Sequence, residues 1–181
     1  WWKAGMTWLE SLELATPMET IRKEDLLLRI KMNTTAIKRV EKELKKIADT
    51  HGGVHLLMGI PGVGIRTAEA MVAYVDDPNR FKDCRKIGNY FGLTPSLDES
   101  AGRSRPGRIT RQGPSIMRRL LTEAAWQAIR CNPSIRQRYL KIRRDDKSRT
   151  KIAIVAIAHY LAKIMLAMLK NNQEWNPGKV A

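Results

Sequence analysis

Residues 150–170 read TKIAIVAIAHYLAKIMLAMLK, an apolar run whose spacing is typical of a helix. The run approaches the length of a membrane span. However, His159 and Lys163 interrupt it, and basic residues flank both of its ends. We therefore interpret the run as the central core helix of an all-α domain, and we expect no membrane partner.

Two more helices are predicted immediately before this core helix. Gly113-Pro114 begins one with an apolar stripe, and Arg118 and Arg119 lie beside that stripe. Asn132-Pro133 ends it and begins a strongly basic helix. Most charge runs are solvated faces, but in a cationic protein such a helix is also a candidate for phosphate contact.

The charge of the whole chain indicates a polyanionic partner. The formal net charge is +15 over 181 residues and the pI is about 10.2, which favours nucleic acid over a small neutral substrate. Hydrophobic residues make up 43%, enough to build a core. Cys84 and Cys131 are far apart in sequence, which indicates reduced, buried thiols in a cytoplasm. We also expect the protein to be nucleoid-associated.

A long helix is predicted over residues 17–50. Thr16, Pro17 and Glu19 form a capping box at its start. Apolar positions then recur every seven residues, which predicts a coiled coil that holds a homodimer or tetramer together. An amphipathic helix packed on its own domain is the alternative. The two series of heptad positions are Ile30, Ile37 and Leu44, and Leu26, Asn33, Val40 and Ile47.

The segments at the two ends of the chain are assigned separately. Residues 1–16 are an apolar segment that we expect to join an upstream domain, and residues 172–181 are a polar tail. The chain begins with Trp1 and not with Met, so we expect it to be a piece of a longer protein. Residues 51–171 are the expected helical domain.

Residues 54–75 resemble a helix-hairpin-helix, a motif that binds the nucleic-acid backbone. Glycines in the turn permit a tight hairpin, and the amide groups that begin the second helix favour a phosphate. A plain turn between two helices is the alternative. The expected nucleic-acid-binding residues here are Gly62, Val63, Gly64, Arg66 and Thr67.

Residues 92–113 read GLTPSLDESAGRSRPGRITRQG, and we expect them to form a flexible loop, here called the serine loop. Ser100 lies at its tip, where a nucleophilic hydroxyl could meet cations that stabilise a phosphoryl transition state. From the residues alone, Ser96, Ser104, Thr110 and Ser115 compete with it. No convincing set of metal ligands accompanies the serine. The expected nucleic-acid-binding residues in and after the loop are Arg103, Arg105, Arg108, Thr110, Arg111, Arg118 and Arg119.

Several motifs occur together in a fixed order along the chain. The motifs are Ile60-Pro61-Gly62-Val63-Gly64, Tyr90-Phe91-Gly92-Leu93-Thr94-Pro95, Ser100-Ala101-Gly102, Gly107-Arg108-Ile109-Thr110-Arg111-Gln112-Gly113, and Arg118-Arg119-Leu120-Leu121 followed by Glu123-Ala124-Ala125-Trp126. This series resembles the C-terminal part of the Piv/MooV-type insertion-sequence transposases, the IS-one-ten family, over nearly the whole chain.

The resemblance implies a function and singles out one serine. Ser100 would be the serine that exchanges DNA strands through a phosphoserine intermediate, although Ala101 replaces the usual first glycine of Ser-Gly-Gly. It also implies that a RuvC-like domain outside this chain holds Mg²⁺ through acidic residues, and that a structured guide RNA serves some members. This chain alone should bind nucleic acid without recombining it. A non-catalytic module for DNA or RNA binding and dimerisation is the alternative.

Overall fold

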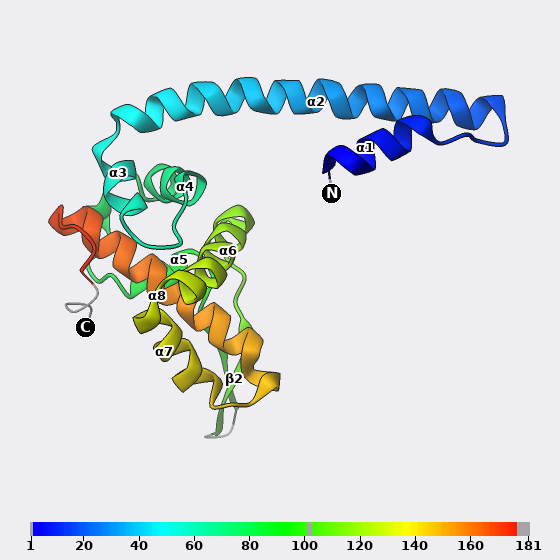
Figure 1. Cartoon of the computed structure of the whole chain (residues 1–181). Coiled ribbons are helices and arrows are strands. Elements are labelled where there is room, and N and C mark those ends of the chain that lie inside the picture. The colour runs from blue at the N-terminus through cyan, green and yellow to red at the C-terminus, as the bar shows by residue number, and fades with distance from the viewer. Residues whose placement is uncertain (1, 101–102, 177–181) are drawn as a thin grey trace. The chain divides into compact units, whose positions relative to one another are not determined.

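The computed structural model describes residues 2–100 and 103–176, with the backbone alone for residues 2, 97–100 and 103–106. The chain divides into two units, one ending at Ile47 and the other beginning at Ala48. Eight α-helices and one pair of strands occur in these described residues (Figure 1). The predicted all-α class is confirmed.

The first unit contains α1, Trp2–Ser11, and most of α2, Pro17–Thr50. The predicted start of α2 is confirmed: the amide of Glu19 donates to Oγ1 of Thr16 at 3.3 Å, and the amide of Thr16 donates to Oε2 of Glu19 at 3.1 Å. This reciprocal pair satisfies two amide groups at the helix start. Lys31 of α2 forms an ion pair with Glu10 of α1 at 2.7 Å.

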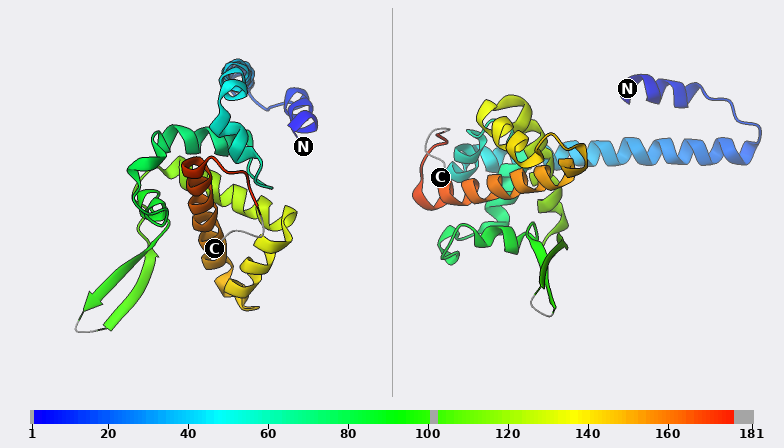
Figure 2. Two further views of the ribbon diagram at one scale, coloured as in Figure 1. Left: turned by 90° about the vertical axis from the view of Figure 1, so that its left-hand side faces the viewer. Right: turned by 90° about the horizontal axis from the view of Figure 1, so that it is seen from below.

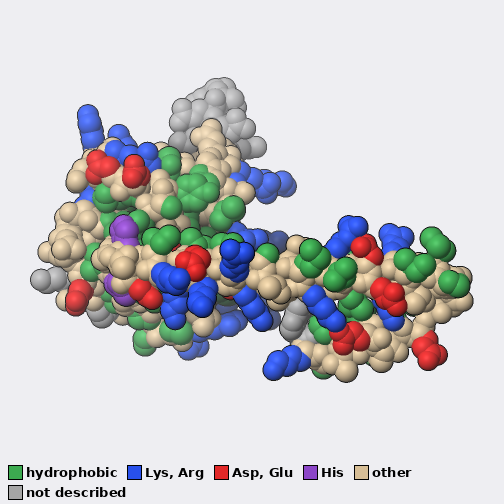
Figure 3. Space-filling model, turned by 90° about the horizontal axis from the view of Figure 1, so that it is seen from above, with side chains coloured by type: hydrophobic (Ala, Val, Ile, Leu, Met, Phe, Trp, Pro, Cys, Tyr) green, Lys and Arg blue, Asp and Glu red, His purple; other side chains and the backbone are tan. Residues whose placement is uncertain are grey.

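Most heptad positions of α2 are solvent-exposed in the single chain, and Ile30 is half-buried. Ile37 and Val40 are each 57% exposed and Ile47 is 64% exposed. Hydrophobic side chains alternate with charged ones on the face of α2 drawn in Figure 3. An apolar seam of this kind is what a coiled coil would cover, and the coiled coil stays a prediction.

The second unit is organised around the core helix α8, Thr150–Asn171. The centre of α8, including Ile157, Leu161 and Met165, is fully buried. The predicted position of this helix is therefore confirmed. The helices of this unit that pack on α8 are α3, Gly52–Met58, α5, Lys86–Tyr90, α6, Ser115–Cys131, and α7, Pro133–Arg143, while α4, Ile65–Val75, packs on α3 and α6.

Length and composition alone would allow α8 to cross a membrane. Among the described residues, Lys147–Asn171 is the one helical stretch that is long and apolar enough to do so. Of its most apolar 18 residues, 56% are buried inside the protein. The buried residues contact α6, α7, α5 and α3, as expected for the core of a helical domain. This burial agrees with the interpretation drawn from His159, Lys163 and the basic flanks.

The serine loop differs from its prediction. It forms an antiparallel hairpin of β1, Pro95–Ser100, and β2, Arg103–Ile109, so the expectation of an irregular loop was wrong. Figure 2 shows the hairpin extending away from the helices of its unit. Prolines, glycines and charged residues hide the period-two pattern of a strand, and the register shifts once between Pro95 and Leu97.

Candidate nucleic-acid interface

Arg118 fixes the root of the hairpin, by which we mean the segments that enter and leave its two strands. From the first turn of α6, its Nη1 donates to the carbonyl oxygens of Phe91 at 3.3 Å, Gln112 at 2.9 Å and Gly113 at 2.8 Å. These carbonyls belong to the segments that enter and leave the hairpin. Across the same root, the amide of Thr110 donates to the carbonyl of Thr94 at 2.9 Å. Both ends of the hairpin are therefore fixed to the helical unit.

A groove of ≈ 530 Å³ opens at this root, and we call it the root groove. It brings Arg111, from the segment that follows β2, beside Arg118 and Arg119 of α6, and all three are predicted binding residues. Arg119 is 72% exposed and meets Glu123 at 3.9 Å, a distance at which an exposed ion pair is weak. The remaining lining residues are Leu93, Ile109, Thr122, Glu123, Trp126 and Val155.

The backbone of the hairpin places Ser100 at the end of β1, paired with Arg103 at the start of β2. Arg105 pairs with Asp98 two residues nearer the root. The side chains of these residues, and the whole of Ala101 and Gly102, lie outside the described part of the structure. Arg108 on β2 is exposed. Ser100 therefore lies at the far end of a paired ladder that is anchored beside the root groove.

The predicted turn between α3 and α4 is present and packs tightly on α6. Gly62 has φ +96°, and a Cβ atom there would collide with the backbone of Ala128. Glycine is required at this position by its conformation and by helix packing. Val63 and Thr67 are buried, at 6% exposure each, so their side chains support the turn from inside.

The other two residues of this turn are more accessible. Gly64 is exposed at the start of α4, with φ −89° and open space around it. Arg66 is half-buried and forms an ion pair with Glu69 at 3.2 Å. Gly62 contacts α6 near Ala128, whereas Arg118 and Arg119 lie about 15 Å away at the other end of that helix. The turn and the root groove are therefore separate surfaces.

Titratable side chains with shifted pKa values lie outside the root groove lining. Burial lowers the pKa of His159, and the positive charge of Lys163 lowers it further. A hydrogen bond with the backbone of Arg85 raises the pKa and so opposes both effects. The ring packs against Gly88 of α5. Burial raises the pKa of Tyr160, and the guanidinium of Arg138 opposes this from 4.1 Å above the ring. Hydrogen bonds from Ser148 lower the pKa of Asp146.

Metal ligands do not converge in the part of the chain that is described. No three His, Cys, Asp or Glu side chains among those residues lie close enough together to hold an ion. The Mg²⁺ that the resemblance implies does not fit these residues. Cys84 is half-buried and Cys131 is exposed, so the expectation of buried thiols was wrong for Cys131.

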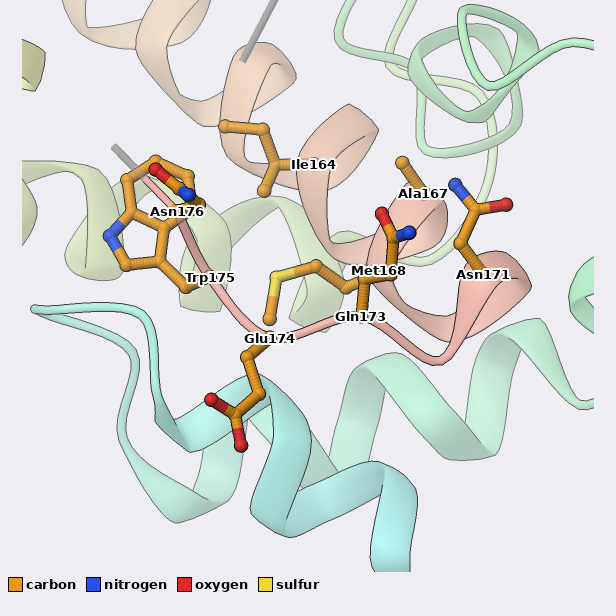
Figure 4. A pocket seen from close by; sticks show the side chains of 8 residues that line it. All are labelled: Ile164, Ala167, Met168, Asn171, Gln173, Glu174, Trp175 and Asn176. Carbon is orange, nitrogen blue, oxygen red and sulfur yellow. The ribbon is translucent and has the colours of Figure 1, made fainter. Parts of the chain in front are cut away.

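A second cavity, of ≈ 270 Å³, lies where α8 ends (Figure 4). Met168 and Asn171 contribute from the helix, and Glu174 and Trp175 from the segment that follows it. Among the described residues, its lining contains a carboxylate and no lysine or arginine. This chemistry does not suit a polyanion, so the cavity is not part of the candidate interface.

Trp126 was not among the predicted binding residues, although it stands in one of the quoted motifs. It is 40% exposed and lines the root groove two helical turns along α6 from Arg119. A basic residue followed seven positions later by an aromatic one on the same helix face is the sequence signal that could have identified it.

Comparison with known proteins gives a family for this part of the chain. Residues 54–140 match the family described as Transposase IS116/IS110/IS902 family. The match runs from α3 into α7 and includes the glycine turn, the hairpin and α6.

Individual relatives agree with this match. A Pseudomonas aeruginosa protein named "Probable family 20 transposase" is 26% identical over 174 residues, covering 93% of this chain and 50% of that protein. The transposase for insertion sequence element IS1111A of Coxiella burnetii is 28% identical, covering 79% of this chain and 40% of the relative. The transposase for insertion sequence element IS1328 of Yersinia enterocolitica is 33% identical, covering 49% of this chain and 27% of the relative.

The chain spans half or less of the length of these relatives. Within that span the family match coincides with the elements that form the candidate interface. Residues 54–140 therefore resemble the transposase domain of the IS110/IS116 family.

Proposed function

We propose that this chain is the serine-bearing, nucleic-acid-binding part of a DNA transposase, with Ser100 as the nucleophile. The observation that carries the proposal is the anchoring of the hairpin beside a groove that contains three arginines. Ser100 lies on a paired ladder whose root is fixed by Arg118, inside the span that matches the transposase family. A nucleophile on an anchored element can be positioned against a phosphate.

The proposed step is an exchange of one ester bond for another. The hydroxyl of Ser100 loses its proton and its Oγ forms a bond to phosphorus, while the bond from phosphorus to one sugar oxygen breaks. The sugar oxygen takes up a proton. A free DNA hydroxyl later attacks the phosphoserine and releases Ser100, so no external energy source is required. Arginines near the reacting phosphate would stabilise the negative charge that develops on its oxygens.

Further roles are proposed for the remaining surfaces. The exposed start of α4 at Gly64, with Arg66, would contact a nucleic-acid backbone, and the seam of α2 would join copies of the chain. A RuvC-like region outside this chain would hold Mg²⁺, and a structured guide RNA is a second partner. By itself the chain would bind nucleic acid in the cytoplasm without recombining it.

Recombination by the complete transposase tests the nucleophile. Ser100→Ala should abolish strand exchange, because no other atom can replace Oγ. Ser96→Ala is the matched control within β1: its hydroxyl donates to the carbonyl of Arg108 at 3.0 Å, so this variant should retain activity. Normal recombination by Ser100→Ala would instead favour the alternative, a non-catalytic binding and dimerisation module.

A further inference from the structure

A second groove continues from the root groove along α6 and α7. It has a volume of ≈ 460 Å³, and Trp126 lines both grooves. Arg119, Trp126 and Arg130 are seven and four residues apart on α6, so they follow one face of the helix. The second groove is lined mainly by Trp126, Arg130, Arg136, Tyr139, Leu140 and Arg143.

Trp126 is supported on one side and open on the other. Its ring centroid lies 6.3 Å from that of Tyr139, which is buried at 6% exposure, while Trp126 itself is 40% exposed. The guanidinium of Arg143 lies 5.8 Å from the centre of the Tyr139 ring. An aromatic ring that is held by its neighbours and faces a groove can stack on a planar ligand with little loss of conformational freedom.

The surroundings of Trp126 are cationic. Arg130 and Arg136 are exposed, and α7 carries four basic residues and no acidic one. Among the described residues that line the two grooves, the acidic member is Glu123, which faces Arg119 at 3.9 Å. Positive charge beside an exposed aromatic ring is the pattern with which proteins bind single-stranded nucleic acid.

We propose that Trp126 stacks on a base of an unpaired strand, while Arg130 and Arg136 bind its phosphates. Base faces are covered in a duplex and open in a single strand, so the tryptophan selects unpaired nucleotides. The inference rests on the proposed function, because a strand that leaves the root groove at Arg119 would reach Trp126 next along α6. The unpaired strand could be DNA or RNA, since both present the same base faces and phosphates.

Equilibrium binding to labelled oligonucleotides tests the proposal. The probes are oligothymidylate, oligouridylate and a DNA duplex of equal length, each titrated with the 181-residue chain at one salt concentration. Trp126→Ala should weaken single-strand binding about 5- to 150-fold, the effect of losing one base stack, and leave duplex binding within about twofold. Trp126→Phe should restore most of the affinity. Trp8→Ala, at an exposed tryptophan of α1, is the matched control and should change nothing.

The outcomes separate the possible explanations. A loss confined to oligothymidylate would support single-stranded DNA as the ligand, and a loss confined to oligouridylate would support RNA. Unchanged single-strand binding, or an equal loss on duplex, would overturn the stacking role while leaving the proposed function intact. Binding of none of the three probes by the unmodified chain would contradict both proposals.

A second variant keeps the test valid if Trp126→Ala does not fold, as judged by circular dichroism. Replacing Arg130 and Arg136 together by glutamine removes two exposed cations and should lower the slope of log affinity against log salt by about 1.4 for single strands. A matched pair, Arg22→Gln with Arg29→Gln on α2, removes the same charge elsewhere and should leave the slope unchanged. Equal slopes for the two double variants would overturn the proposal.

Discussion

At the scale of single residues, Arg118 shows how one side chain determines the position of a candidate site. Its guanidinium satisfies carbonyl oxygens from both ends of the hairpin, and it also lines the root groove. Charged donors form stronger hydrogen bonds to carbonyls than neutral donors do. Arg118 is therefore a structural residue of the interface, whereas its exposed neighbour Arg119 is available for a ligand.

Arg118→Ala should lower the free energy of unfolding by about 2 kcal/mol, because three carbonyls lose a charged donor. Arg119→Ala should change it by no more than about 0.5 kcal/mol, since its ion pair with Glu123 is long and exposed. Urea unfolding of the two variants and the unmodified chain measures both values. Equal effects of the two replacements would contradict the assignment of Arg118 to the hairpin root.

His159 gives the fold a dependence on pH. Burial against α5 lowers its folded pKa below the ordinary value of 6.5, so the unfolded chain binds a proton more readily. The stability that neutral His159 contributes is fully present above pH 6.5, and it is lost as the pH drops from 6.5 toward the folded pKa. Unfolding measured at pH 7.5 and 5.5 should show this decrease, and His159→Gln should reduce it. If His55→Gln, at an exposed histidine, reduced the decrease equally, the assignment to His159 would be wrong.

At the scale of elements, the sequence predicted the helices well and the hairpin poorly. Local signals define α2 and α7. Thr16 forms the expected capping hydrogen bonds, and Oδ1 of Asn132 accepts from the amides of Ser134 and Ile135 where α7 begins. The strands contain Pro106 and Gly107 and have no apolar face, so local periodicity could not reveal them. The segments that flank them accept hydrogen bonds from Arg118, a long-range contact that no local pattern encodes.

The same difference between local and long-range signals applies to the candidate interface. The basic residues of the root groove could be predicted from charge and from their motifs. The burial of Val63 and Thr67 could not, because it depends on how the turn packs against α6. Trp126 was missed because its exposure and its support by Tyr139 appear only when α6 and α7 come together.

The turn between α3 and α4 offers a matched pair of glycine variants. Gly62→Ala should cost at least about 1–3 kcal/mol of stability, because its φ is positive and the new methyl group would collide with Ala128. Gly64→Val should leave stability within about 1 kcal/mol, since Gly64 has an extended backbone and open space. It should nevertheless weaken duplex binding if the start of α4 contacts phosphate. Thermal unfolding and duplex titration together measure the two effects, and unchanged duplex affinity of a folded Gly64→Val variant would exclude that contact.

At the scale of the whole molecule, the predicted coiled coil would determine how many copies act together. Ile37→Asp with Leu44→Asp places two charges in the apolar seam of α2 and should convert an assembly into a monomer of 20.6 kDa. Thr35→Asp with Lys42→Asp is the control, because these positions are also seven apart but lie off the seam. Sedimentation equilibrium measures the mass. An unchanged assembly in the seam variant would exclude α2 as the interface.

The measurement that tests the central claim most directly is the chemical identity of a trapped protein–DNA intermediate. The complete transposase is incubated with a DNA substrate whose cut end diffuses away, so that the covalent intermediate accumulates. The adduct is then digested and sequenced by mass spectrometry. If Ser100 is the nucleophile, one nucleotide is joined through phosphate to Ser100, and Ser100→Ala forms no adduct. An adduct on another residue, or one that persists in Ser100→Ala, would contradict that assignment.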